Sequence, residues 1–272
     1  MGFLDSAVSS NTQTKDKTVV HGLGGVGKTT FGIQAAKANK GIFFLGENGL
    51  NKLQEGDGVP RLNIEAWDIP KNVPDKIQAK FSGITFKGAL RELMVTDHDY
   101  KLLVVDTLDS LIPGLDEYVV WNSYGGDYGK ADAYKSKYND YAREMTSILK
   151  AFDYLIDKKG MEVMVLVHSV VNNHKDPSSE AWKRWELALP GGDKTSLGAL
   201  VFDWADNVLF AKYDVEVKGD KFDKKGKGRD RVCYTVWDAS YDAKTRHNLP
   251  EKMPFEYGTF QKFLNPEQGD KK

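Results

Sequence analysis

A glycine-rich segment offers the clearest chemistry in this sequence. Residues 22–29 are Gly-Leu-Gly-Gly-Val-Gly-Lys-Thr, so a glycine, four residues, a second glycine, a lysine and a threonine follow in order. Glycines let the backbone curl so that successive N–H groups point at phosphate oxygens, and a helix starting after the loop adds the positive end of its dipole. A glycine-rich turn without a ligand is disfavoured because the segment lies between a predicted strand and a predicted helix. The spacing therefore predicts a loop that binds the phosphates of a nucleotide.

The polar residues of this loop are expected to divide the ligand between them. Lys28 should reach the β and γ phosphates of ATP, Thr29 should place its hydroxyl on Mg²⁺, and Thr30 should support the α phosphate. ATP and Mg²⁺ are therefore the expected ligands. The residues expected to bind the nucleotide are Gly22, Gly24, Gly25, Val26, Gly27, Lys28, Thr29 and Thr30.

A second magnesium ligand is expected at Asp106. This residue ends the apolar run at residues 102–105, and a parallel sheet presents the residues at its carboxyl ends to the ligand. Asp106 would thus be the acidic partner of Thr29 in holding Mg²⁺. The alternative is a capping or turn aspartate, which often follows a strand.

The residue that activates water is harder to locate. The neighbour of Asp106 is Thr107, so a glutamate at that position is not available. Glu47 follows an apolar strand at residues 41–45 and should emerge on the same edge of the sheet as the phosphate loop. On spacing alone, a solvated loop glutamate is an equally good interpretation.

His168 is a candidate sensor of the γ phosphate. It ends a predicted strand at residues 163–167, on the edge where the nucleotide should lie. A structural histidine at a strand end is the alternative. The long polar loop predicted at residues 169–196 would receive the signal.

That loop carries basic residues interleaved with tryptophans. Lys175, Lys183 and Arg184 are the candidates for contact with single-stranded DNA, because cations follow the backbone and indoles stack on bases. The same composition also suits tryptophans buried against the sheet or a contact between subunits. The sequence leaves these alternatives open.

The elements that position these residues form an α/β pattern. A strand beginning at Thr18, the glycine loop, a helix at residues 28–38 and the strand at residues 41–45 make a βαβ unit, whose strands run parallel. The chain thus predicts a mainly parallel central sheet flanked by helices and completed by a C-terminal antiparallel hairpin. The later elements are expected as helices at residues 86–94 and 132–159, with Gly160 ending the second, and as hairpin strands at residues 206–213 and 231–237.

Composition sets the limits of this interpretation. The chain has 272 residues, of which 40% are hydrophobic and 28% charged, with one cysteine, Cys233, and a formal net charge of -1. We expect one cytoplasmic, soluble domain at residues 17–263 between flexible tails at 1–16 and 264–272. The net charge argues against a surface coated with nucleic acid. The basic connection at residues 217–229 is expected to be a solvated turn in preference to a binding element.

Taken in order, the motifs resemble a known family. They are similar to phage-encoded RecA-like ATP-binding proteins, which include Sak-type single-strand annealing recombinases, within the wider RecA, RadA and KaiC group. The resemblance covers residues 18–263. It is carried by residues 21–30, 46–49, 104–111, 165–169, 203–206 and 244–246.

The resemblance implies a RecA-like P-loop NTPase in which Glu47 activates water. It also implies that Lys244 and Arg246, on either side of Thr245, reach the γ phosphate of a neighbouring protomer, which requires a homo-oligomeric ring or filament. A basic pair on the surface is the alternative. The segment at residues 117–132 and the loop after Ser169 depart from bacterial RecA, so the DNA contacts do not carry over residue by residue.

The leading expectation is an ATP-dependent phage recombination protein that acts on single-stranded DNA in the cytoplasm of a bacterial host. The rival is a nucleotide-switched assembly ATPase that acts on a protein partner without DNA, which the near-neutral charge permits. A small-molecule phosphotransferase is disfavoured because there is no clear arginine cluster between Asp106 and Val163.

Overall fold

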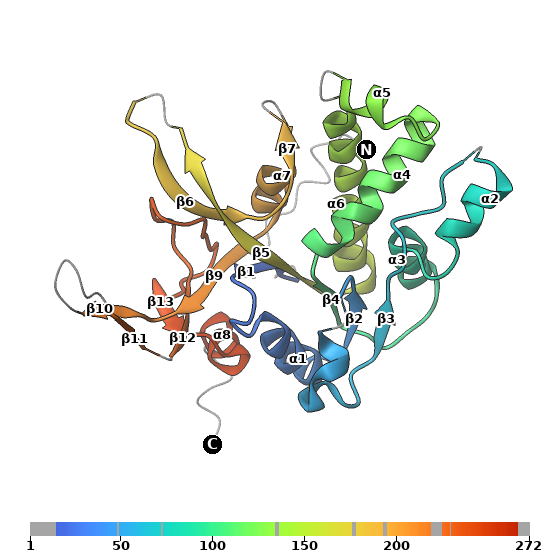
Figure 1. Ribbon diagram of the computed structural model, residues 1–272. Helices are drawn as coiled ribbons and strands as arrows, with labels where there is room; N and C mark the ends of the chain where they lie inside the picture. Colours follow the sequence, from blue (N-terminus) through green and yellow to red (C-terminus); the bar gives the residue numbers. More distant parts are fainter. Residues whose placement is uncertain are drawn as a thin grey trace, which may run out of the picture.

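A large sheet of mainly parallel strands runs through the molecule (Figure 1). The computed structural model describes residues 15–47, 49–71, 73–133, 136–175, 178–192, 195–218, 225–228 and 230–265. Along the sheet the strands follow the order β13-β12-β9-β1-β5-β4-β2-β3, and β6 pairs with β5 beside this path. The bounds are β1 Lys17–Gly22, β2 Gly41–Leu45, β3 Arg61–Asn63, β4 Leu102–Asp106, β5 Glu162–His174, β6 Trp182–Leu187, β9 Asn207–Tyr213, β12 Arg231–Tyr234 and β13 Lys252–Pro254.

Helices cover both faces of this sheet. The helices are α1 Lys28–Ala38, α2 Asp75–Gln78, α3 Phe86–Val95, α4 Ile112–Tyr124, α5 Tyr128–Asp132, α6 Lys137–Lys159, α7 Leu197–Trp204 and α8 Tyr257–Leu264. Short 3-10 turns lie at Leu50–Lys52, Gln54–Gly56, Ala79–Phe81 and Asp109–Leu111. Helices α1 and α8 share one core with the sheet, and α3, α4, α6 and α7 share the other.

Strands β2 and β4 consist almost entirely of apolar residues because both of their faces are buried. Every residue of β2 and of β4 is buried. Successive side chains of a strand point to opposite faces. Val19 and Phe44 therefore pack in the core of α6, while Val20 and Phe43 pack in the core of α1. This burial on both sides is typical of parallel sheets, and it confirms the expected α/β class.

Most predicted elements lie within a residue of their expected bounds. Helix α1 and strand β2 match them, and α6 ends at Gly160, whose positive φ of 62° forms the expected left-handed cap. The start of α6 was predicted too early. The chain from Asp132 to Lys137 is not continuously helical, because Asp132 ends the separate helix α5 and Ser136 precedes α6.

The prediction of a long polar loop at residues 169–196 was wrong. Strand β5 continues past His168 to His174 and turns back into β6, forming an antiparallel hairpin. The pairs Val171 with Trp185 and His174 with Trp182 face each other across it. Aromatic and β-branched cross-strand pairs of this kind stabilise a hairpin. Two very short strands, β7 Gly191–Gly192 and β8 Thr195–Ser196, then lead to α7.

The C-terminal hairpin is present in an extended form. Strand β12 pairs antiparallel with β9 as expected, although it ends at Tyr234. A third antiparallel strand, β13, was not predicted. Between β9 and β12, strands β10 Glu216–Lys218 and β11 Lys225–Lys227 form a separate ribbon. The turn around Lys224 lies outside the described residues.

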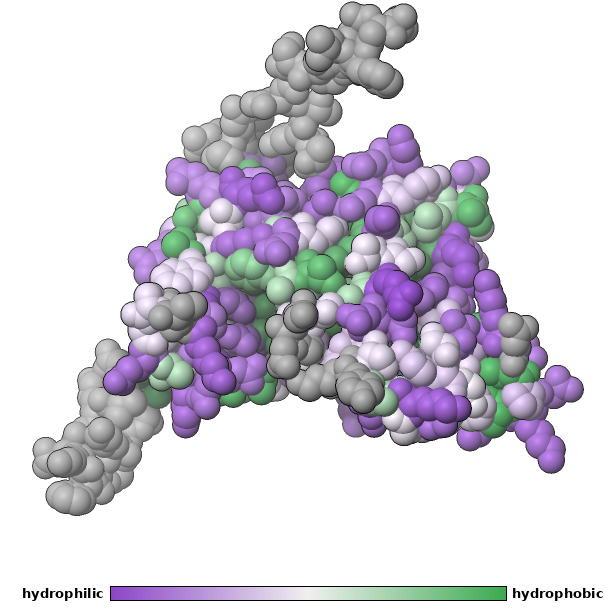
Figure 2. All heavy atoms as spheres, turned by 90° about the horizontal axis from the view of Figure 1, so that it is seen from above, coloured by the Kyte–Doolittle hydropathy of each residue, from purple (hydrophilic) through white to green (hydrophobic). Residues whose placement is uncertain are grey.

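The two predicted tails lie mostly outside the described residues. Of the N-terminal segment, Lys15 and Asp16 are described, and both contact the domain: the Asp16 carboxylate lies 2.8 Å from Nε2 of His247. None of the described helices is both long and apolar enough to cross a membrane. On the face shown in Figure 2, hydrophilic residues cover much of the surface, and apolar residues are visible between them and at the margins.

Candidate nucleotide-binding site

The predicted site residues meet where the parallel strands end. Gly22, the last residue of β1, lies opposite His168 of β5 and Ala211 of β9. Asp106, the last residue of β4, lies opposite Leu45 of β2. The glycine loop, Asp106, Glu47 and His168 therefore come from neighbouring strands at one edge of the sheet, which is the edge where such folds bind ligands.

The glycine loop has the backbone that its sequence predicts. Gly25 and Gly27 have positive φ values of 78° and 100°, which side chains rarely allow, and α1 begins directly afterwards at Lys28. No side chain caps the first turn of α1. Its N–H groups, together with the helix dipole, are thus available to an anion.

The ammonium group of Lys28 lies inside the loop. Its Nζ donates to the carbonyl oxygens of Gly22 and Leu23, at 3.0 and 3.1 Å, and the residue is only 5% exposed. Burial lowers the pKa of Lys28, although the carboxylates around it act in the opposite direction. A buried cation held this way is poorly solvated, so a phosphate would be a favourable replacement for the lost water.

Asp106 and Thr29 form a contact that fits a divalent cation. The Thr29 hydroxyl donates to Asp106 Oδ2 at 2.9 Å, while Oδ1 is buried without any hydrogen-bond partner. Burial raises the pKa of Asp106 to about 6, and the hydrogen bond from Thr29 opposes the rise. An orphaned carboxylate oxygen beside a hydroxyl suits Mg²⁺, a hard cation that prefers oxygen ligands.

A complete protein cage for a metal is not found in the described residues. No group of three or more histidine, cysteine, aspartate or glutamate side chains there could hold an ion. Magnesium in phosphate-binding sites takes one or two protein oxygens and completes its shell with phosphate and water. Thr29 and Asp106 supply that kind of partial set.

Glu47 lies beside this pair with a free carboxylate edge. It is exposed, and Oε1 accepts a hydrogen bond of 3.0 Å from the hydroxyl of Thr107. The loop that follows it passes close to Thr29, because a side chain added at Gly49 would touch the Thr29 hydroxyl at 3.9 Å. The carboxylate is thus placed to polarise water near a bound phosphate.

His168 is held by an aspartate that the sequence did not single out for this role. Asp109 Oδ1 accepts from the backbone N–H of His168, and Oδ2 accepts from ring Nδ1, both at 2.8 Å. The hydrogen bond with Asp109 raises the pKa of His168, while burial opposes it. Burial alone would raise the pKa of Asp109, but the hydrogen bonds from His168 outweigh burial and lower this pKa. Nδ1 therefore carries a proton, and no hydrogen bond of Nε2 with another described residue is found.

Tyr213 is a second contact that the sequence gave no reason to select. Its hydroxyl donates to the carbonyl of Gly25 in the glycine loop at 3.0 Å. Tyr213 is the last residue of β9, which neighbours β1. Nothing in the local sequence marks this contact, because it depends on the pairing of β9 with β1.

Lys244 and Arg246 lie far from this edge. Lys244 pairs with Val208 near the start of β9, and the N–H of Arg246 donates to Asp206, whereas Ala211 is the residue level with the glycine loop. At about 3.3 Å per residue, Lys244 and Arg246 sit roughly 10 and 16 Å back along the strand. They cannot reach the glycine loop of their own chain.

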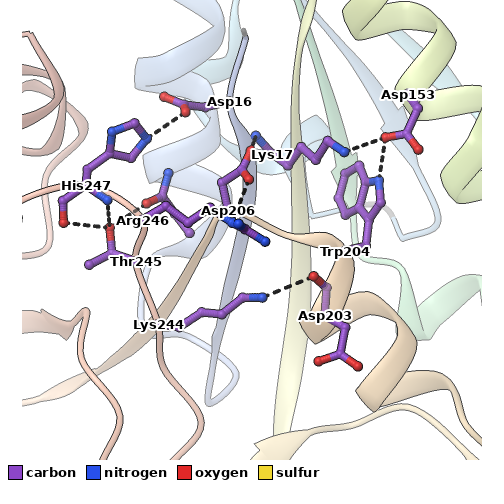
Figure 3. Close-up of polar contacts among 11 residues, drawn as sticks. Asp16, Lys17, Asp153, Asp203, Trp204, Asp206, Lys244, Thr245, Arg246 and His247 are labelled. Carbon is purple, nitrogen blue, oxygen red and sulfur yellow. Dashed lines mark hydrogen bonds and ion pairs between the residues drawn. The ribbon is translucent and has the colours of Figure 1, made fainter. Parts of the chain in front are cut away.

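Figure 3 shows how the chain holds these two cations. Lys244 Nζ donates to the carbonyl oxygen of Asp203 at 3.2 Å and lies 4.7 Å from the ring centre of Phe202. Arg246 Nε lies 3.1 Å from the carboxylate of Asp206, yet the arginine side chain is 66% exposed. Lys244 is thus partly enclosed, and Arg246 remains accessible from outside.

The three nucleic-acid candidates separate on the hairpin. Lys175 and Lys183 are exposed. Arg184, in contrast, is 6% exposed and pairs with Asp242 at 2.7 Å while donating to the carbonyl of Tyr241. The prediction that Arg184 contacts single-stranded DNA is therefore wrong, because its charge is already neutralised inside the protein.

The tryptophans of the hairpin are partly committed to contacts within the chain. Trp182 Nε1 donates to the carbonyl of Ala239 at 2.7 Å, and the Trp185 ring lies 6.2 Å from that of Phe210. These contacts favour the structural alternative for both indoles. The two tryptophans thus tie the hairpin to Ala239 and to Phe210 of β9, while its lysines face solvent.

Comparison with known proteins identifies the family of the chain. No curated protein matches the chain. The sequence model of a protein family described as an AAA domain matches residues 14–247, which contain the glycine loop, Glu47, Asp106, His168 and the Lys244 segment. Because the matched stretch spans most of the chain, this protein belongs to the AAA domain family and has a P-loop ATPase-type domain.

Proposed function

We propose that this protein is a magnesium-dependent ATP hydrolase whose turnover is coupled to single-stranded DNA during recombination. The observation that carries the proposal is the meeting of the glycine loop, Lys28, Asp106, Glu47 and His168 at one sheet edge. The sequence resemblance to phage RecA-like recombination proteins supplies the DNA substrate and the setting.

Each residue has a distinct part in the proposed reaction. The backbone of the glycine loop and Lys28 would bind the β and γ phosphates and fix the terminal phosphate for attack. Glu47 would orient a water molecule and accept its proton. His168, oriented by Asp109, would donate from Nε2 when protonated and so respond to the γ phosphate. Mg²⁺, held by Thr29 and Asp106, would neutralise charge that develops on the phosphates.

Assembly completes the site in this proposal. The glycine loop lacks a cation from Lys244 or Arg246 of its own chain, since both lie at the opposite end of β9. The exposed guanidinium of Arg246 would instead reach the γ phosphate of an adjacent protomer in a ring or filament. A cation supplied in this way stabilises the transition state only once subunits are assembled.

The β5–β6 hairpin links the site to the proposed DNA contact. Strand β5 passes directly from His168 to the hairpin, where Lys175 and Lys183 are exposed. Two cations on a two-stranded projection can follow a phosphate backbone. The contact would be weak in each protomer and would gain strength from repetition along an oligomer.

ATP hydrolysis measured with and without single-stranded DNA, at low and at moderate salt, tests the proposal. We expect stimulation by DNA that falls as salt rises, because phosphate contacts release counterions. The double variant Lys175→Gln and Lys183→Gln should lose the stimulation and keep the basal rate. Lys80→Gln with Lys158→Gln is the matched control, since both lysines are exposed and lie away from the hairpin. A basal rate of zero in the wild-type protein would contradict the hydrolase itself.

One observation favours a second function. The charge of Arg184 is internally paired and the chain carries a net charge of -1, so the attraction for DNA is modest. A nucleotide-switched assembly ATPase acting on a protein partner would use the same site without DNA. Turnover that is indifferent to DNA, together with assembly that depends on nucleotide and is insensitive to salt, would support this alternative.

A further inference from the structure

An arginine that plays no part in the proposed reaction lies against the glycine loop. Arg231 is the first residue of β12 and pairs across the sheet with Tyr213 of β9. A Cβ added at Gly27 would collide with Arg231 Nη1 and lie 3.5 Å from Cζ. The guanidinium thus occupies the space that the missing side chain of Gly27 leaves open.

Two strands therefore touch the loop from the same side. The hydroxyl of Tyr213 bonds to the carbonyl of Gly25, and the guanidinium of Arg231 covers Gly27. Both contacts stand at the root of the β10–β11 ribbon, since β9 leads into the ribbon and β12 leaves it. The chain could have closed this side of the loop with an apolar residue, but it places a permanent cation there.

The charge of Arg231 is not used elsewhere in the described part of the chain. Its side chain makes no hydrogen bond or ion pair with the described residues, and the residue is exposed. The nearby carboxylate of Asp214 is taken by Lys252 at 2.7 Å. This differs from Arg184 and Arg246, each of which has an aspartate partner.

The position of the Arg231 guanidinium favours a phosphate as its ligand. Gly27 immediately precedes α1, so the guanidinium stands beside the uncapped N–H groups of the first helical turn. Those groups and the helix dipole attract a phosphate. A guanidinium with several donors in a fixed plane binds phosphate oxygens in pairs. The cation and the N–H groups therefore lie at the same end of α1, where both favour an anionic ligand.

We propose that Arg231 is a second phosphate-binding cation of the nucleotide site, supplied by the same chain. It would contact the phosphates on the side of the loop away from Asp106 and Glu47. The inference rests on the proposed nucleotide site. It adds a residue from the C-terminal strands, so that nucleotide binding also fixes the root of the β10–β11 ribbon.

Calorimetric titration of ADP and ATP, each with Mg²⁺, into the whole chain tests this assignment. Arg231→Gln should weaken both nucleotides by about tenfold or more, because a charged hydrogen-bond donor is lost. Arg231→Lys should recover part of the affinity, since it restores the charge but not the paired geometry. Lys262→Gln removes an exposed cation from helix α8, which packs beside α1, and should bind nucleotide as the wild type does.

The possible outcomes distinguish failure of the nucleotide site from failure of the role proposed for Arg231. If the wild-type protein binds nucleotide and Arg231→Gln binds it equally well, the role of Arg231 is overturned while the nucleotide site stands. Equal losses in the Gln and Lys variants would show that Arg231 only packs against the loop. If the wild-type protein binds neither nucleotide, the proposed function and this inference both fail. Thermal unfolding of each variant without nucleotide checks that the fold is retained.

Discussion

Charged groups are paired differently at the carboxyl ends and at the amino ends of the parallel strands. At the carboxyl end, burial lowers the pKa of Lys28 and raises that of Asp106 to about 6, and one oxygen of Asp106 has no partner. At the amino end, Lys17 pairs with Asp153 at 2.7 Å and Arg246 pairs with Asp206. One end keeps charges poorly compensated, and the other neutralises them within the chain.

This difference indicates that the carboxyl end is the part of the sheet organised to bind a ligand. Poorly solvated charges are costly unless a ligand completes their interactions, so they mark functional sites more reliably than paired surface ions do. Exposed ion pairs contribute little to stability and separate easily. The pair of Arg246 and Asp206 can therefore open for a partner at small cost, whereas the carboxyl end is already organised.

Replacing Glu47 with glutamine should give the largest effect. The variant keeps the shape of the side chain but cannot accept a proton, so turnover should fall by about 10³-fold while ATP affinity stays near that of the wild type. Steady-state hydrolysis and nucleotide titration measure the two quantities separately. Turnover at the wild-type rate would remove Glu47 from the reaction and weaken the contrast between the two ends.

Lys28→Ala should act on binding. Loss of the buried ammonium group should weaken ATP affinity by about 10²-fold, since a charged contact to phosphate is removed from a poorly solvated place. Lys17→Ala is the control at the other end of β1, where the ammonium pairs with Asp153 in the same chain. If both variants bind ATP alike, the two ends do not differ in the way described.

A buried histidine next to the glycine loop should make the stability of the fold depend on pH. His21 is fully buried, with Nε2 donating to the carbonyl of Asp242 and Nδ1 accepting from the hydroxyl of Ser169, and burial lowers its pKa to about 4. The folded protein therefore resists protonating a ring that the unfolded chain protonates near pH 6.5. Unfolding should become easier as pH falls from 6.5 to 4, by up to about 3 kcal/mol.

Urea unfolding at pH 7.5 and at pH 4.5 measures this dependence. His21→Gln should lose less stability between the two pH values than the wild type does. His247→Gln is the control at the amino end, where the ring is partly exposed and lies 2.8 Å from Asp16. An unchanged pH dependence in His21→Gln would show that burial of this ring is not its source.

The smallest expected effect concerns assembly. Arg246→Ala should lower turnover of the assembled protein by about tenfold, because the proposed cation for a neighbouring phosphate is lost. Mixing this variant with Lys28→Ala should restore part of the activity, since each protomer supplies what the other lacks. Mixtures that stay as inactive as their components would argue against a cation acting between subunits.

The glycine loop and the strands that precede Glu47 and Asp106 could be predicted from the sequence because their signals are local. The spacing of glycine, lysine and threonine, and the apolar runs before Glu47 and Asp106, need no knowledge of distant residues. The expected site residues at these positions do converge at one edge. Their roles in hydrolysis remain predictions that the variants above address.

The hairpin and the supporting contacts could not be predicted in the same way. Ser169 to His174 forms a strand only because Trp182 and Trp185 return to pair with it, and the bond between Tyr213 and Gly25 joins segments far apart in the chain. Burial of Arg184 likewise depends on Asp242. Such features follow from tertiary packing, which overrides local composition.

The central place of β1 has a consequence for how the protein is made. Thr18 pairs with Met164 on one side and with Asn207 on the other. Strand β1 therefore cannot complete its pairing until two segments that are synthesised much later are present. Folding that depends on such distant pairings is slow. Until β9 has left the ribosome, the glycine loop stands on a strand with one open edge. Acquisition of nucleotide binding during synthesis would therefore report that the sheet has closed around β1.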